Sequence, residues 1–152
     1  MLGILIHLLS KLHEIWYNVR FYTVNYLNGT LFFFAYIKII ILYRIQSHLS
    51  ESIDEVKWVS ELFPSSKHYT GVYEDTGLLN GKTILAHGVH LNDDELNMLR
   101  CTGGGISHCP NSNCSLKSGF CNVLRLRDYG VKVGLGTDCA GGYSPSMIDS
   151  MR

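Results

Sequence analysis

Four side chains that could bind a metal ion or move a proton each close an apolar run of the sequence. His48 ends "YRIQSH" and His87 ends "KTILAH", while His108 ends "GISH" and Asp138 ends "VKVGLGTD". Imidazole nitrogen and carboxylate oxygen are ligands of a borderline divalent ion such as Zn²⁺, and a catalytic site keeps one coordination position open for water. A single histidine at such a place is more often a structural residue, and Asp138 alone could cap the following turn. Four such side chains at equivalent ends indicate a shared functional site.

Glu51 follows His48 by three residues, which is close enough for its carboxylate to reach the same site. There a carboxylate could carry a proton to a substrate. Alternatively, Glu51 is a first-turn residue that interacts favourably with the dipole of the following helix. The spacing alone supports both interpretations.

The elements that must position these side chains begin near residue 44, where apolar runs alternate with helical patterns. Extended segments are predicted at 43–48, 82–87, 105–108 and 131–138. Helices are predicted at 51–63, 92–100, 118–130 and from 144 onwards. In the first helix, one apolar face is expected to comprise Ile53, Val56, Val59, Leu62 and Phe63. Asn92 is expected to be the N-cap of the second helix, and Gly130 is expected to end the third.

Four successive strand–helix units predict an α/β fold with parallel strands joined by crossover helices. Either an open doubly wound sheet or part of a (β/α)₈ barrel satisfies this order. Apolar strands without polar alternation predict a sheet that is buried on both faces. In both folds, functional groups gather at the carboxyl ends of the strands, which is where the four polar side chains stand.

Residues 1–43 differ from the rest of the chain. They are crowded with Ile, Leu, Phe and Tyr, contain a single acidic residue, Glu14, and show little helical or alternating order. No clear signal peptide is present. The best membrane-span candidate, 31–42, is shorter than the roughly 20 residues that a helix needs to cross a bilayer, and it contains Lys38. We therefore expect an atypical hydrophobic segment that is not native fold-forming sequence, such as a gene-model artefact, with a membrane anchor as the alternative.

The overall composition excludes several classes of function. Thirteen basic residues balance thirteen acidic ones, so no net field would attract nucleic acid or an anionic membrane. Five cysteines without a CxxC pattern suggest neither a disulfide framework nor a zinc ribbon, and they fit a reducing compartment. "HCPNSN", residues 108–113, is rich in turn-formers and amides, which either line the mouth of the site or build a loop.

Four motifs carry a resemblance to a known family. "IQSHLSE", "LAHGVHL", "ISHCPNSN" and "VGLGTDCAGGYS" resemble, in order and spacing, the ends of barrel strands five to eight in the amidohydrolase superfamily, and most of all the guanine deaminase family. Related deaminases and chlorohydrolases share much of this pattern. The resemblance implies a partial (β/α)₈ TIM-type barrel over residues 44–152, comprising strands five to eight with their helices, preceded by the irregular segment 1–43.

The same resemblance implies zinc-dependent hydrolytic deamination of guanine to xanthine and ammonia. His48 and Asp138 would be zinc ligands, with His87 as a candidate third. Asp138 would also take a proton from the attacking water, Glu51 would pass a proton to the purine ring and the leaving amine, and His87 would hydrogen-bond the water or the substrate. These four residues and His108 would line the substrate site. The family further implies a cytosolic homodimer.

The sequence also departs from the family pattern. The H-x-H pair of the first barrel strand is absent from the chain, and strands one to four have no counterpart. The substrate-clamping arginine expected before strand five is missing, since Arg44 lies inside the run that leads to His48. We therefore expect a truncated chain that is catalytically silent by itself, the alternative being a non-catalytic half-barrel.

Overall fold

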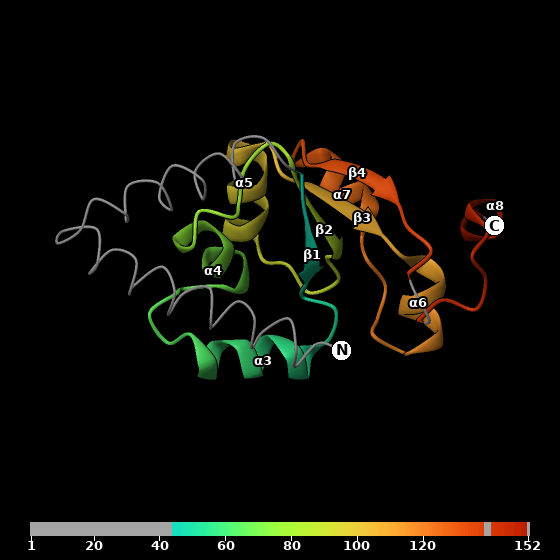
Figure 1. Cartoon of the computed structure of the whole chain (residues 1–152), viewed down its shortest axis with the longest axis horizontal. Coiled ribbons are helices and arrows are strands. Elements are labelled where there is room, and N and C mark those ends of the chain that lie inside the picture. The colour runs from blue at the N-terminus through green and yellow to red at the C-terminus, as the bar shows by residue number, and fades with distance from the viewer. Residues whose placement is uncertain (1–43, 139–140, 152) are drawn as a thin grey trace, which may run out of the picture. The chain divides into compact units, whose positions relative to one another are not determined.

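The computed structural model describes residues 44–138 and 141–151, so the expectations for segment 1–43 concern residues outside this description. Ten elements follow one another in the described residues (Figure 1). In chain order they are β1 (Ile45–Leu49), α3 (Ile53–Leu62), α4 (Tyr69–Asp75), β2 (Thr83–His87), α5 (Asp93–Thr102), β3 (Gly105–His108), α6 (Pro110–Ser115), α7 (Val123–Asp128), β4 (Lys132–Leu135) and α8 (Met147–Ser150).

The four strands form one parallel sheet in the order β1-β2-β3-β4. Consecutive strands are neighbours, and every connection between them contains at least one helix, as parallel pairing requires. The predicted α/β alternation is therefore confirmed over the described residues. Because all four strands run the same way, their carboxyl ends meet at one edge of the sheet.

The packed core lies between the sheet and its covering helices. Leu49, Leu85 and Ile106 come from the first three strands and are at most 1% exposed. Burying such side chains contributes about 1.5–3 kcal/mol each. The helices supply the opposing layer, whose most buried apolar members are Val59, Val72, Tyr73, Leu96, Leu99 and Leu126.

The second helix of the sequence pattern begins where it was predicted to begin. The Asn92 side chain accepts a hydrogen bond from the Glu95 N–H, and the Glu95 carboxylate accepts one from the Asn92 N–H, both at 3.0 Å. This reciprocal capping box satisfies two donors that would otherwise lack partners at the start of α5. The helix ends at Gly103, whose φ of 74° is a left-handed conformation suited to glycine.

The expected apolar face of the first helix is wrong at both ends. Ile53 is 62% exposed and Leu62 is 44% exposed, whereas Glu55 is buried. Glu55 is buried because its carboxylate accepts hydrogen bonds from the Tyr69 hydroxyl and the Glu51 N–H. A satisfied buried carboxylate turns this face of α3 inward, which hydrophobic periodicity cannot anticipate.

The start of the third predicted helix differs from the prediction. The segment predicted as one helix over 118–130 forms only α7, because the Asn122 side chain caps it by accepting from the Arg125 N–H. The helix ends at Asp128 with Tyr129 as its C-cap, and the predicted Gly130 is the next residue, with a left-handed φ of 76°. Two short helices, α4 and α6, were not predicted. Among the described residues, none of the helices is long and apolar enough to cross a membrane.

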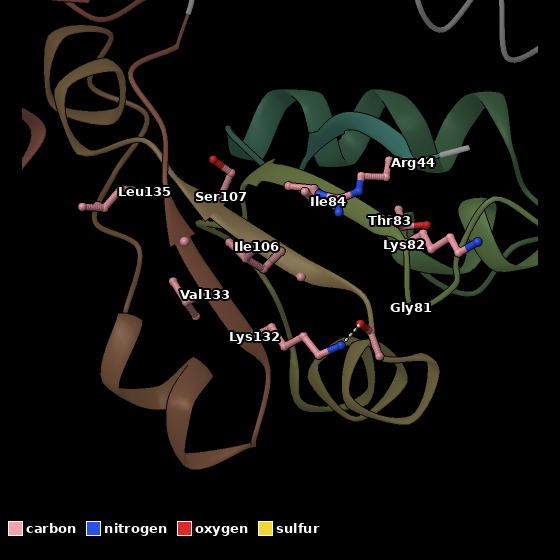
Figure 2. A pocket seen from close by; sticks show the side chains of 13 residues that line it. Arg44, Gly81, Lys82, Thr83, Ile84, Ile106, Ser107, Lys132, Val133 and Leu135 are labelled. Carbon is pink, nitrogen blue, oxygen red and sulfur yellow. Dashed lines mark hydrogen bonds between the residues drawn. The ribbon is translucent and has the colours of Figure 1, made fainter. Parts of the chain in front are cut away.

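The prediction of a sheet buried on both faces is wrong for the described residues. Ile84, Val133 and Leu135 are 37–40% exposed, and every residue of β4 is exposed. A hollow of about 500 Å³ lies on the sheet, lined by residues of β2, β3 and β4 (Figure 2). At its edge the Lys132 ammonium donates to the Gly103 carbonyl at 3.1 Å. The strands are apolar enough for burial on two sides, but the described helices leave these side chains partly uncovered.

Candidate metal centre

Three of the four predicted strand-end side chains converge at the carboxyl edge of the sheet. His48, His87 and Asp138 each offer one ligand atom, and these atoms lie within 4.8 Å of one another. The two imidazole rings are stacked, with centroids 5.3 Å apart and planes inclined by 24°. This proximity follows from the register of β1 and β2, in which Leu49 pairs with His87 and His48 pairs with Ala86.

The backbone at the site departs from ordinary strand geometry. His87 and Asp138 have φ values of 74° and 56°, and Ser50, at the end of β1, has a φ of 50°. Non-glycine residues rarely adopt positive φ, and such conformations cluster at functional sites. Here they turn the chain out of the strands at the point where the ligand atoms must meet.

Glu51 joins this cluster from the loop after β1. One of its carboxylate oxygens, Oε2, lies 3.6 Å from His87 Nε2, and the other, Oε1, accepts a hydrogen bond from the Ser118 hydroxyl at 3.1 Å. The N-cap of α3 is Ser52, so Glu51 precedes the helix. The alternative that Glu51 is a first-turn residue is therefore wrong, because its side chain lies at the cluster.

His87 is fully buried and has a different partner on each side of its ring. Nδ1 lies 2.9 Å from Asn113 Oδ1, while Nε2 lies 3.6 Å from Glu51 Oε2 and 4.0 Å from Asp138 Oδ2. An amide oxygen can only accept, so Nδ1 donates in this bond. The arrangement directs Nε2 to the side where the two carboxylates stand.

Tyr73, from α4, holds the strand that carries His48. Its hydroxyl donates to the His48 carbonyl at 2.7 Å and accepts from the Ser47 hydroxyl, also at 2.7 Å. Burial raises the pKa of the Tyr73 phenol, so it remains protonated and can donate over the whole neutral range. Tyr73 was not predicted as a site residue, because the sequence pattern does not indicate α4.

The donor set of this cluster fits a divalent cation. His48 Nδ1 and His87 Nε2 are both buried, and neither has a hydrogen-bond partner among the described residues. Leaving a buried polar group unsatisfied costs about 1–3 kcal/mol. Two imidazoles and a carboxylate, whose ligand atoms lie within 4.8 Å of one another, are the donor types that one bound ion would satisfy together.

His108 stands at the end of β3, as predicted, but it is not a member of the three-residue ligand group. Burial lowers the pKa of His108, so its imidazole is neutral at neutral pH. The motif that follows it folds as α6, and this helix brings Asn113 to His87. The amide-rich composition of "HCPNSN" was the signal for this contact, although the sequence could not say which amide makes it.

The hollow of Figure 2 is separate from this cluster, because none of His48, His87 and Asp138 lines it. Residues 43–152 match the model of the amidohydrolase family.

The chain belongs to the amidohydrolase family. It is 56% identical to human guanine deaminase over 109 residues, which are 72% of this chain and 24% of the human protein. Its identity to the Escherichia coli guanine deaminase is 37% over 108 residues, or 71% of this chain and 25% of that protein. The chain thus spans about a quarter of the length of these relatives.

Solved amidohydrolase-like structures share the same architecture. A guanine deaminase from C. acetobutylicum, with guanine bound in its active site, superposes with a TM-score of 0.72 at 34% identity, covering 76% of this chain and 28% of that one. An adenosine deaminase from Xanthomonas campestris with bound zinc has a TM-score of 0.68 at 24% identity, a likeness of fold alone. The described sheet is accordingly part of a TIM-type barrel, and the family is metal-dependent.

Proposed function

We propose that residues 44–152 supply strands five to eight of a guanine deaminase barrel, which hydrolyses guanine to xanthine and ammonia. The main support for this proposal is that His48, His87 and Asp138 converge at the carboxyl edge of the sheet. Glu51 lies beside them. Support comes from relatives that are named guanine deaminases, among them the human protein at 56% identity. We further propose that the complete protein is a cytosolic homodimer, as the family resemblance implies.

The proposed metal is Zn²⁺, held by His48 and Asp138 with His87 as a third donor. Two nitrogen donors and one carboxylate match the ligands that zinc prefers in hydrolytic sites. When bound, zinc lowers the pKa of a water molecule towards neutrality. The two buried imidazole nitrogens, which have no hydrogen-bond partner in the part of the chain that the structure describes, support this assignment over a purely structural role for the histidines.

The protein's own groups handle the protons of the proposed reaction. The Asp138 carboxylate takes the proton that the attacking water loses, and Glu51 delivers a proton to the purine ring and to the leaving amine. The Ser118 hydroxyl donates a hydrogen bond to Glu51 Oε1, and Glu51 Oε2 faces His87. His87 hydrogen-bonds the water or the substrate when it is not a ligand, and His108 completes the substrate-lining set. In the net reaction, guanine and one water molecule give xanthine and one ammonia molecule.

A non-catalytic half-barrel is the second candidate for this polypeptide by itself. The observation that favours it is the partly exposed sheet, where Ile84, Val133 and Leu135 lack full cover among the described residues. A related deaminase or chlorohydrolase activity is the alternative for the complete protein, because such enzymes share much of the motif pattern. The two questions need separate experiments.

The activity is tested by a chimera in which residues 44–152 replace the matched segment of human guanine deaminase, with which they share 56% identity. We expect the chimera to release ammonia from guanine and to leave adenosine and a chlorotriazine intact. A chimera that binds zinc but acts on one of those two instead would refute the substrate assignment. The unmodified human enzyme and a chimera carrying His48→Ala serve as the positive and negative controls.

A further inference from the structure

The contact between Asn113 and His87 joins two segments that lie 26 residues apart in the sequence. Asn113 is 2% exposed and sits in α6, whereas His87 is fully buried at the end of β2. The two side chains meet at 2.9 Å, between Asn113 Oδ1 and His87 Nδ1. This contact was not predicted from the sequence.

Packing alone does not account for an amide at this position. Asn113 Nδ2 is buried and has no hydrogen-bond partner among the described residues. A buried amide that leaves its donors unsatisfied destabilises the fold relative to an apolar side chain of similar shape. What the amide contributes is therefore the bond that its oxygen makes to His87.

We propose that Asn113 is a positioning residue that keeps a proton on Nδ1 of His87 and so presents Nε2 to the cluster. The amide oxygen accepts, which makes Nδ1 the donor, and the ring is then held with Nε2 towards Glu51 and Asp138. Metal-ligating histidines commonly donate their second N–H in this way, which fixes both ring orientation and tautomer. The inference rests on the proposed function, since it deepens the role of His87 there.

The segment around α6 is built to hold Asn113 at a fixed distance from His87. Pro110 occupies the first turn of α6, where no intrahelical donor is needed. After the helix, the Ser118 N–H donates to the Asn113 carbonyl at 2.9 Å, and His90 Nε2 donates to the Ser118 carbonyl at 2.9 Å. His90 lies three residues after His87, so the loop that carries His87 is tied to the segment that carries Asn113.

Asn111 offers a matched control on the same helix. It is 6% exposed, and its Nδ2 donates to the Ser150 hydroxyl at 3.3 Å. Replacing Asn111 disturbs the packing of α6 without removing the contact to His87. Asn113→Asp is the conservative variant, because an ionised carboxylate can only accept.

The test uses the 152-residue chain with ¹⁵N-labelled histidine, in the metal-free state and with added Zn²⁺. We expect the unchanged chain, Asn113→Asp and Asn111→Ala each to show a proton on His87 Nδ1 in ¹H–¹⁵N spectra, and Asn113→Ala to lose it. Zinc affinity, measured by competition with a chromophoric chelator, should fall about 10–100-fold in Asn113→Ala and should be retained in the other two variants.

Three results would overturn the proposal. The first is an Nδ1 without a proton in the unchanged chain, because the Asn113 amide would then be the donor. The second is retention of that proton in Asn113→Ala, and the third is an equal loss in Asn111→Ala, which would indicate general helix packing. Failure of the proposed metal site is seen separately: His48→Ala would then leave zinc affinity unchanged, while the metal-free spectra still decide the role of Asn113.

Discussion

The Ser118 hydroxyl donates to one carboxylate oxygen of Glu51, and the other oxygen lies 3.6 Å from His87 Nε2. Glu51 is not in the group of three metal-capable residues, so its proposed contribution is to carry a proton. In the chimera with human guanine deaminase, Glu51→Gln should lower turnover about 10²–10⁴-fold, since that is the usual contribution of a proton carrier. Zinc content should be unchanged, because the amide leaves the ligand set intact.

The control for this change is Glu61→Gln, an exposed residue on α3. Turnover should be unaffected there. Loss of zinc from the Glu51→Gln chimera, measured by atomic absorption, would instead make Glu51 a structural or metal-binding residue.

The cysteines differ in burial, and this predicts their order of reaction. Cys101 and Cys114 are exposed, whereas burial raises the pKa of the Cys109 thiol and raises that of Cys121 to about 11. A raised pKa lowers the thiolate fraction at a given pH, and the thiolate is the nucleophile. At pH 8, iodoacetamide should therefore modify Cys101 and Cys114 first, with Cys121 reacting faster as the pH approaches 11.

Peptide mass spectrometry in a Cys139→Ser background measures this order directly. The same reaction in urea is the control, because unfolding removes the burial that raises the pKa. Comparable rates for all four thiols in the folded chain at pH 8 would contradict the prediction.

At the scale of elements, the capping box of α5 is the clearest local determinant of a boundary. The Asn92 side chain satisfies the Glu95 N–H, so Asn92→Ala should lower the free energy of unfolding by about 1 kcal/mol. Asn97→Ala is the matched control, since Asn97 is exposed and its amide donates to the Asp93 carbonyl within the same helix. Urea unfolding midpoints compare the two variants, and an equal loss in both would argue against the cap.

At the scale of the whole molecule, the 152-residue chain should be silent towards guanine. A hydrolytic zinc site usually has three protein ligands and an open position within a closed pocket, and the H-x-H of the first barrel strand is absent here. Among residues 44–138 and 141–151, the four-stranded sheet has two strands without a second neighbour, and such edges favour association between chains over a preorganised active-site pocket. Guanine loss with added zinc should equal the background of a His48→Ala sample. Turnover that disappears in that variant would refute this expectation.

We also propose that residues 44–152 form a folding unit that does not need segment 1–43. The family match begins at residue 43, and segment 1–43 lacks the periodicity that directs one face towards a core. Residues 44–152 expressed alone should therefore give a soluble yield equal to or better than that of the whole chain. A sharp fall in soluble yield would show that the hydrophobic segment is needed to cover apolar surface.

The strand–helix order, the Asn92 cap and the four strand-end side chains could all be predicted from the sequence. These features depend on local patterns: runs of apolar residues, helix-capping side chains and the rule that parallel strands place their carboxyl ends together. The resemblance to the amidohydrolases rested on the same local motifs, and the family match confirmed it.

Only the tertiary structure decided which of these side chains meet. It brought His48, His87 and Asp138 together and left His108 outside that ligand group, although the four had equivalent places in the sequence. It also selected the amide that contacts His87 and the hydroxyl that contacts Glu51, across separations of 26 and 67 residues. Contacts over such separations depend on strand register, positive-φ turns and short helices such as α6. Those features arise from packing between segments, which no local pattern in the sequence records.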